Sequence, residues 1–415
     1  MFDTIRNGIA WYQDPYGFLD QRIEQKHYDF RVDLPGSDGA MFVGTPDLIA
    51  EAVRNKHLIG GAGLRFVQPF TGPRALIVIA GADHQQRRRA VQKMFYQAHN
   101  QRMQALTDKH FAAAARELQP GRDFSLLPFY EQVTLRTIID YVFDPDEAEH
   151  SQLYALMHQW MKSFESPIWL FLKPLQRDLG SFSPWGRFLR GRQAVSDWIA
   201  SRLDSTPAGS ASVLGQLIGE RQSGALEISD EDLVWQCIEL LLFGHDTAAC
   251  GAAWVAMHLL DNDMMASPEL ESRAYREACI KEALRITPMV IHVTRIATAD
   301  TTVGNETILK GQKVFPCAYL AQRHHEHYDH PDKFDPGRFL QDAPDKYANF
   351  PFGAGNRLCA GMPFANAQME LLLRRTLELG SIEKLGTGRT TAERKFIIMA
   401  PEDGGCVRLK PASGP

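Results

Sequence analysis

The pattern of hydrophobic and polar positions divides the chain into three stretches. From about residue 10 to 80, short apolar runs such as Met41–Gly44 and Ala75–Ile79 alternate with turn residues, which indicates strands. From about 83 to 285, apolar residues recur at helical spacing. From 288 to 350, prolines and short apolar runs predict loops with short strands. The pattern therefore predicts a mainly α chain with a minor β part.

The longest predicted helix runs from Asp230 to Asn262 and would measure about 50 Å at 1.5 Å per residue. It is apolar on nearly all sides near its centre, which is typical of a helix inside a large core. The other predicted elements are a helix over 84–95 capped by Asp83, a helix over 268–286 capped by Ser267 and stopped by Pro288, a helix over 360–380 ended by Gly380, and a closing hairpin of 396–399 and 406–409.

Composition and charge exclude several classes of protein. The 415 residues are 44% hydrophobic and 23% charged, which is ordinary for a globular chain and argues against disorder. The net charge of −5 argues against nucleic-acid binding. No run reaches the ~18 apolar residues of a membrane span, and no secretory signal begins the chain. We therefore expect a cytoplasmic protein without a transmembrane anchor.

The chain contains no long linker of the kind that separates independent domains. We expect a single domain over 1–415, with a β-richer N-terminal part (about 1–80), a helical core (about 83–285) and a C-terminal part (about 286–415) that carries the chemistry. The six cysteines include no C-x-x-C pair, and none precedes Cys237. This usage suits a reducing compartment rather than a disulfide framework.

The most informative segment surrounds Cys359. Glycines at 353, 355 and 361 allow backbone shapes that other residues disfavour, and Cys359 comes just before a predicted helix. Backbone N–H groups and the positive end of the helix dipole would favour a thiolate there. A thiolate in such a loop is what an axial haem-iron ligand requires. A lone cysteine is more often a small buried hydrophobe, but the full pattern F-x-x-G-x-R-x-C-x-G favours the ligand.

With this pattern, the chain resembles the cytochrome P450 superfamily of haem-thiolate monooxygenases from about residue 80 to the end. The resemblance implies haem b between the long central helix and the cysteine loop, with Cys359 as the metal ligand. It also assigns Phe352, Gly355 and Gly361 of this loop to cofactor binding.

The segment Glu282-Ala283-Leu284-Arg285 matches the family's E-x-x-R helix, and Phe334–Phe339 matches the later loop that pairs with it. At i and i+3, Glu282 and Arg285 share a helix face. The resemblance implies that these two and Arg338 together stabilise the haem-binding core. The alternative for such a pair is a solvated ion pair of little energetic worth.

The middle of the long helix contains Gly244-His245-Asp246-Thr247, which resembles the family's oxygen-activation segment. Glycine and threonine are poor helix formers, so a local opening is expected there. The resemblance implies that Thr247 hydrogen-bonds dioxygen while Asp246 relays protons. The alternatives are a buried structural acid at 246 and a Thr247 hydroxyl bonded back to the helix.

Four cationic or imidazole side chains are candidates to bind the haem propionates. His84 and Arg88 are four residues apart, hence on one helix face, and resemble the family's H-x-x-x-R pair. The resemblance adds Arg295, which follows the E-x-x-R helix at the family's usual distance, and Arg357, which precedes Cys359 by two residues. Cations that face two carboxylates are the expected chemistry.

Electrons must come from separate proteins, because the sequence has no flavin or iron–sulfur motif. We expect a ferredoxin or flavodoxin-type donor with its NAD(P)H reductase, acting on a monomer. A basic surface of Arg87, Arg89 and Lys93 would suit an acidic donor, although it is equally consistent with an ordinary solvated helix face.

The substrate pocket is expected from the family's positions, and its residues are largely apolar: Phe66, Val67, Phe70, Phe243, Met289, Val290, His292 and Ile398. For each of them a place in the core is an equal alternative. His292 is the polar exception and would orient a substrate oxygen or bond a propionate or backbone carbonyl. The apolar run 166–172 is expected to be a roof packed on its own core, with a lid or a membrane- or carrier-binding patch as alternatives.

The sequence thus predicts a monooxygenase that inserts one atom of dioxygen into a lipophilic small molecule by hydroxylation or epoxidation, in secondary metabolism or lipid and terpenoid oxidation. One alternative is a peroxide-using or non-redox haem-thiolate enzyme. Another is a haem-binding sensor without turnover. The Asp246–Thr247 pair favours the monooxygenase, because neither alternative needs it.

Overall fold

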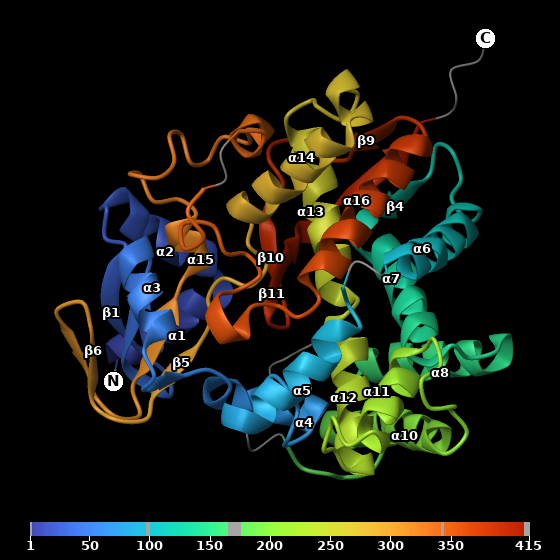
Figure 1. The fold of residues 1–415 in the computed structure, drawn as a ribbon. Coiled ribbons are helices and arrows are strands. Elements are labelled where there is room, and N and C mark those ends of the chain that lie inside the picture. The colour runs from blue at the N-terminus through green and yellow to red at the C-terminus, as the bar shows by residue number, and fades with distance from the viewer. Residues whose placement is uncertain (1, 97–99, 165–175, 342–343, 411–415) are drawn as a thin grey trace.

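The computed structural model describes residues 2–96, 100–164, 176–341 and 344–410, and it is mostly helical (Figure 1). The helices are α1 (Phe2–Gln13), α2 (Pro15–Glu24), α3 (Pro46–Arg54), α4 (Gln68–Thr71), α5 (Gly81–Lys93), α6 (Asn100–Ala115), α7 (Leu126–Phe143), α8 (Glu147–Lys162), α10 (Pro184–Leu203), α11 (Val213–Gln222), α12 (Asp230–Phe243), α13 (Asp246–Asp261), α14 (Arg273–Ile286), α15 (Ala318–Ala321) and α16 (Met362–Glu378). The prediction of a mainly α chain with a minor β part is confirmed.

The strands are short and form four small sheets. They are β1 (Asp29–Leu34), β2 (Ser37–Val43), β3 (Leu58–Ile59), β4 (Asp123–Ser125), β5 (Arg295–Ala297), β6 (Thr301–Val303), β7 (Glu306–Ile308), β8 (Lys313–Pro316), β9 (Ile382–Lys384), β10 (Ala392–Lys395), β11 (Ile398–Pro401) and β12 (Cys406–Leu409). The largest sheet has the order β1-β2-β8-β5-β3, and its β2–β8 pair is parallel. It therefore brings the N-terminal part and the segment after α14 side by side, at the left of Figure 1.

The N-terminal part contains more helix than expected. Besides β1, β2 and β3, it holds α1, α2, α3 and α4, so residues 1–80 contain more strand than the helical core but also several helices that the sequence analysis did not predict. Local caps define two of these short helices. Asp14 accepts a hydrogen bond from the Gly17 N–H (2.9 Å) ahead of α2, and Pro46 occupies the first position of α3. Helices this short carry too little periodicity to be recognised by pattern.

The apolar run Ala75–Ile79, predicted as a strand, is instead a buried turn. The Leu76 and Ile77 N–H groups donate to the Glu239 carboxylate of α12, at 2.9 and 2.8 Å. A side chain therefore satisfies backbone groups that a neighbouring strand would otherwise take. Burial raises the pKa of Glu239 to about 7, although these hydrogen bonds lower it.

The predicted long helix is divided into α12 and α13 by a turn at Gly244–His245, so the expected local opening is present. A Cβ atom at 244 would lie 2.4 Å from the Leu240 carbonyl oxygen, so this turn requires glycine. The run Asp230–Asp261 is the single membrane-length apolar segment in the described part of the chain, and 72% of its most apolar window is buried inside the protein. This burial is expected of a core helix.

Two other predicted helix boundaries and one predicted strand pairing are wrong. Asp83 lies in the first turn of α5 rather than before it, because that helix begins at Gly81. The 268–286 helix is split at Ser272 into a 3₁₀ turn (Pro268–Glu271) and α14, since Ser272 is extended. The closing hairpin does not form: β11 pairs with β10, whereas β12 pairs with β4 and β9. The pairing of β12 with β4 joins segments that are far apart in the sequence, and hydrophobic periodicity does not reveal which strands pair.

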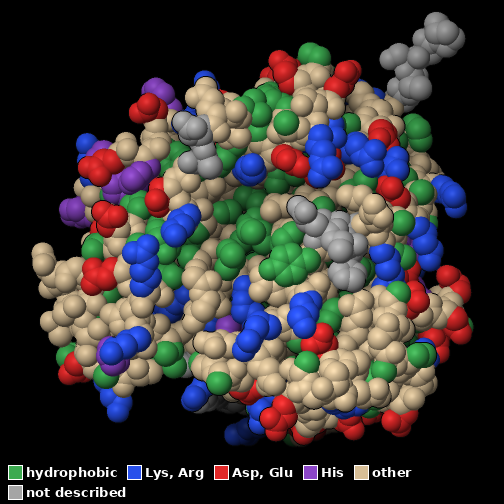
Figure 2. Space-filling view, in the orientation of Figure 1, with side chains coloured by type: hydrophobic (Ala, Val, Ile, Leu, Met, Phe, Trp, Pro, Cys, Tyr) green, Lys and Arg blue, Asp and Glu red, His purple; other side chains and the backbone are tan. Residues whose placement is uncertain are grey.

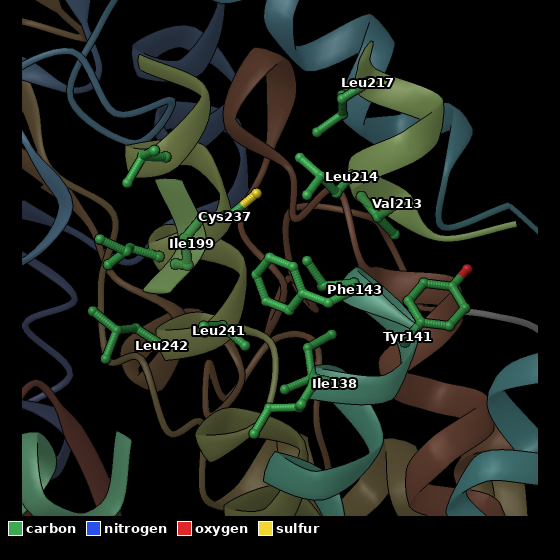
Figure 3. Close-up of a cluster of buried hydrophobic side chains, with 14 of the residues drawn as sticks. Ile138, Tyr141, Phe143, Ile199, Val213, Leu214, Leu217, Cys237, Leu241 and Leu242 are labelled. Atoms are coloured by element: carbon green, nitrogen blue, oxygen red, sulfur yellow. The ribbon is translucent and has the colours of Figure 1, made fainter. Parts of the chain in front are cut away.

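The helical core is built from side chains that converge from α7, α10, α11 and α12 (Figure 3).

The buried carboxylate of Asp140 in α7 connects this helix to α6 and α8. It accepts from His110 Nε2 (2.8 Å), His150 Nδ1 (2.5 Å) and Lys109 Nζ (3.2 Å). Burial raises the pKa of Asp140, but these partners outweigh it and lower the pKa well below its usual range. Because both Asp140 carboxylate oxygens accept hydrogen bonds, we interpret the cluster as a hydrogen-bond network that connects the three helices.

Candidate functional site

The cysteine loop folds into a shape that depends on two glycines. Gly353 and Gly355 have φ of +77° and +65°, and a Cβ at 355 would lie 2.5 Å from Val53 Cγ1. The Cys359 N–H donates to the Phe352 carbonyl at 2.8 Å, which closes the loop ahead of α16. The Cys359 side chain is exposed. The backbone thus presents one thiol without using it in packing.

The environment of Cys359 favours the thiol until a positive ion binds it. Neighbouring protein atoms partly desolvate the exposed thiol and raise the pKa of Cys359, while the Gly361 N–H and the Arg88 charge lower it in part. The loop alone therefore favours the thiol, contrary to the expectation of a thiolate, although the Gly361 N–H acts in the expected direction. A coordinated metal ion removes the thiol proton outright, so ligation would supply what the fold does not.

Hydrophobic side chains line a hollow at the centre of the face shown in Figure 2, and Lys and Arg side chains surround it. In Figure 1 this hollow lies in front of β10 and β11, between α16 and α5. The combination of an apolar interior and a cationic border suits a ligand with an apolar body and an anionic edge.

Two arginines near the cysteine loop have no carboxylate ion-pair partner among the described residues: Arg295, which is buried, and Arg357, which is half-buried. Arg295 is 2% exposed and donates only to the carbonyls of Thr294 (3.4 Å) and Ala354 (3.3 Å). Arg357 donates to the Gly60 (2.9 Å) and Leu76 carbonyls, and its Nε has no partner. The pKa of each is lowered to about 10, by burial for Arg295 and by burial together with the charges of Arg295 and Arg88 for Arg357.

His84 completes this group from α5, four residues before Arg88. Its pKa is lowered to about 4, chiefly by burial and also by the charges of Arg357 and Arg88. Clustered buried cations that repel one another are costly unless an anion joins them. A Cβ at Gly60 would lie 2.9 Å from the Arg295 and Arg357 guanidinium groups, so a glycine leaves room beside them. The donor set therefore fits the two propionates of haem, with the Cys359 thiol available to iron.

The E-x-x-R pair forms a fully buried ion pair. Both side chains have 0% exposure, and Arg285 Nε and Nη2 donate to the two Glu282 oxygens at 2.7 and 2.8 Å. Arg338 Nε and the Asp335 N–H also donate to Glu282 Oε1, at 3.3 and 2.9 Å. Arg285 Nη1 in turn donates to the Gln322 carbonyl (2.8 Å). The three expected residues are brought together, which joins α14 to the loop around 335.

Asp246 begins α13 directly after the helix break, and Thr247 follows it. The Thr247 hydroxyl donates to the Phe243 carbonyl at 3.1 Å, which is the bond back to the helix that the sequence left open. Asp246 Oδ1 accepts from Lys395 Nζ at 2.9 Å, and the same ammonium donates to Glu131 of α7.

Sequence reasoning missed Lys395 and Glu131, because α7 and β10 meet Asp246 only through the fold. The available signal was weak. Glu131 is a lone acid in the apolar first half of α7, and Lys395 precedes the tip of a hairpin whose other strand was expected near the pocket.

The predicted pocket residues fall into different surroundings. Phe70 packs on Phe164, Phe188 and Phe396, with ring centroids about 5 Å apart, and Phe243 joins the same cluster. Met289 and Ile398 are buried in a second cluster with Phe352 at its edge, and Val67 is buried in a third. Phe66 and Val290 are exposed. Phe396, at the β10–β11 tip, is a further aromatic neighbour that the sequence did not single out.

His292 is placed among aromatic rings of the N-terminal part. It contacts Trp11, Phe42 and Phe315, with ring centroids 5.6, 5.8 and 4.4 Å away. Burial lowers its pKa to about 3, with smaller contributions from Arg394 and Lys313. These are the surroundings of a neutral core histidine. The apolar run 166–172 lies outside the described residues.

The expected basic surface is smaller than the sequence indicated. Arg87 is buried, and it donates to Asp83 (3.0 Å) and Asp232 (2.6 Å). Lys93 pairs with Glu220 at 2.9 Å, while Arg89 is exposed. Helical spacing cannot reveal that Arg87 points toward α12 and its acid.

Comparison with known proteins gives consistent matches. The sequence model of the family described as Cytochrome P450 matches residues 11–405. Among curated proteins, the chain is 26% identical over 387 residues to the Mycobacterium tuberculosis protein named "Putative cytochrome P450 138", covering 89% of this chain and 83% of that protein. It is 25% identical over 365 residues to "Putative cytochrome P450 137" of the same species, covering 86% and 77%.

Proposed function

Because the chain belongs to the cytochrome P450 family, whose members are haem-thiolate monooxygenases, we propose that it oxidises a lipophilic small molecule with dioxygen and electrons from separate redox proteins. The observation that carries the proposal is the exposed Cys359 thiol in its glycine-rich loop, with Arg295 and Arg357 lacking a carboxylate ion-pair partner among the described residues. The apolar hollow in Figure 2 suits a lipophilic ligand. An apolar interior suits the hydroxylation or epoxidation of a lipid, a terpenoid or another secondary metabolite. We place this reaction in the cytoplasm.

The haem-binding roles follow from the donor set. Cys359 ligates the iron, Phe352, Gly355 and Gly361 shape its loop, and the propionates bind among His84, Arg88, Arg295 and Arg357. When bound, the haem supplies the activation of dioxygen and its transfer to carbon. Glu282, Arg285 and Arg338 stabilise the base of this loop structure rather than take part in chemistry.

The protein's own contribution to the reaction is to hold protons where oxygen is reduced. The break between α12 and α13 opens the helix beside Asp246 and Thr247. Although the Thr247 hydroxyl donates to Phe243, its oxygen retains acceptor capacity, and a rotation about χ1 would redirect the donor. Asp246 remains ionised and accepts a proton that it passes to this hydroxyl. The apolar side chains around Phe70 and Phe243 orient the substrate and exclude water.

A ferredoxin or flavodoxin-type donor with an NAD(P)H reductase supplies the electrons. With Arg87 buried, the basic surface for an acidic donor reduces to exposed cations such as Arg89. Single exposed charges mainly change the association rate and its salt dependence.

Thr247→Ala tests the proton role. We expect NAD(P)H consumption to continue while product per NAD(P)H falls about tenfold or more and hydrogen peroxide accumulates, because a positioned proton donor typically contributes ~10²–10⁴-fold. The measurement is the ratio of product, peroxide and NAD(P)H under steady turnover.

The matched control is Thr137→Ala in α7, which removes a buried hydroxyl with the same bond back to its helix (Thr137 Oγ1 to the Val133 carbonyl, 2.8 Å). It should leave the ratio unchanged. Unaltered coupling in Thr247→Ala would show that protons arrive by another route. Product formed with peroxide alone, and not with dioxygen and reductant, would replace the proposal by a peroxide-using enzyme.

A further inference from the structure

One ammonium group joins two carboxyl groups from distant parts of the chain at the helix break. Lys395 Nζ donates to Asp246 Oδ1 at 2.9 Å and to Glu131 Oε1. The Glu131 and Asp246 carboxyl groups are also within hydrogen-bonding reach of each other. Three elements, α7, α13 and β10, therefore meet at one cluster beside Thr247.

The Glu131 and Asp246 carboxyl groups differ in pKa. Burial raises the pKa of Glu131 to about 8, together with the negative charge of Asp246 and despite Lys395. Burial also raises the pKa of Asp246, but Lys395 and His245 outweigh it, and the result is a lowered pKa. The other titratable groups that face the cluster are His245 and Cys250 beside Asp246, and Tyr154 of α8 near Glu131. At neutral pH the pair therefore shares one proton, and the raised pKa of Glu131 and lowered pKa of Asp246 favour its place on Glu131.

Resting on the proton role proposed for Asp246, we propose that Glu131 is the residue that stores and supplies protons to Asp246, with Lys395 positioning the pair. In each transfer the Glu131 O–H bond breaks and an O–H bond forms on Asp246, which passes the proton toward Thr247. Glu131, now a carboxylate beside Lys395, takes the next proton from water. No electrons move within the cluster. The proton that leaves toward Thr247 makes the cluster one unit more negative, and the proton that Glu131 takes up from solvent restores its charge.

The structure supports two parts of this proposal: the supply of protons from water to Glu131, and a fixed position for Lys395. About a quarter of the Glu131 side chain is exposed, so water can reach its carboxyl group. Lys395 directly precedes Phe396, which has φ of +55° and packs its ring on Phe70 at 5.0 Å. The hairpin tip is thereby held against the aromatic cluster, and the ammonium is held between the two acids.

A purely structural ion-pair lock would look the same in a static structure, so the test needs a readout that depends on the proton. Glu131→Gln keeps an oxygen that accepts from Lys395 and cannot store an acidic proton. Infrared difference spectra of the holoprotein across pH should contain a carboxylic-acid C=O band that disappears with a midpoint at about pH 8, distinct from that of Glu239, whose pKa of about 7 gives a lower midpoint. The band should be absent in Glu131→Gln and present in the control Glu147→Gln, an exposed glutamate of α8.

Turnover provides the second readout. Coupling in the parent protein should be constant below pH 8 and fall as pH rises through about 8, because Glu131 loses its stored proton there. In Glu131→Gln, coupling should be about tenfold lower and should not show this pH step. The loss is smaller than the ~10²–10⁴-fold contribution of a positioned acid, because water supplies part of the protons in place of Glu131. Lys395→Met should move the band midpoint upward, since it removes the charge that lowers the pKa of Glu131.

A missing band, or a Glu131→Gln protein with parental coupling and pH profile, would overturn the inference. Asp246→Asn separates it from the proposed function. If Asp246→Asn uncouples turnover and Glu131→Gln does not, only the supply by Glu131 is wrong. If Asp246→Asn leaves coupling unchanged, the proton role of Asp246 is wrong and the inference fails with it. The carbon-monoxide spectrum of each variant establishes that its haem site is intact.

Discussion

Cys359→Ala is expected to abolish the thiolate absorption spectrum and essentially all monooxygenase activity. Among the described part of the chain, Cys359 is the cysteine whose side chain is exposed in the glycine-rich loop beside the cationic cluster. Alanine removes the sulfur and leaves the loop backbone unchanged, so no other side chain takes over the ligand position. Because the propionate cations remain, some haem should still associate, but weakly and without a thiolate band.

The measurement is the absorption spectrum of the reduced protein before and after carbon monoxide. The parent should give the strongly red-shifted Soret band of a thiolate–iron complex, and Cys359→Ala should not. The control is Cys406→Ala, a half-buried free cysteine of β12, which should keep the parental band. A red-shifted band retained in Cys359→Ala would place the ligand elsewhere and reopen every role assigned to the loop.

The parts of the site that sequence predicted well are those encoded locally. Glu282 and Arg285 are three residues apart on one helix, so spacing alone puts them on a common face. The opening at Gly244–His245 follows from the poor helix propensity of glycine in an otherwise apolar run. The cysteine loop is contiguous, and two of its three glycines, Gly353 and Gly355, have the positive φ values that glycine allows.

The parts that sequence could not predict depend on contacts between distant segments. Lys395 and Glu131 reach Asp246 from 149 residues later and from another helix, and no local pattern relates them. Ala75–Ile79 has the composition of a strand, yet Glu239 takes its N–H groups and makes it a turn. Arg87 looked like a surface cation because helical spacing records its face but not the acid of α12 that it meets.

Glu282→Ala is expected to destabilise the protein by about 3–5 kcal/mol, because removing one partner of a buried ion pair leaves the other charge uncompensated. Arg285 is fully buried and would lose two hydrogen bonds, while Arg338 and the Asp335 N–H would lose their acceptor. Such a loss is a large share of the ~5–15 kcal/mol by which proteins are stable. We therefore expect little folded holoprotein.

The matched control for this variant lies on the same helix. Glu277→Ala in α14 removes an exposed partner of Arg273, an i,i+4 pair worth about 0–1 kcal/mol. Haem per chain and the thermal unfolding midpoint of both variants test the contrast, and the double variant Glu282→Leu/Arg285→Met separates charge from shape. If the buried charge causes the loss, the double variant recovers part of the stability, because an apolar pair of similar volume replaces an ion pair at little cost. Full haem content and a parental midpoint in Glu282→Ala would contradict the structural role, since the buried Arg285 charge would then have another partner.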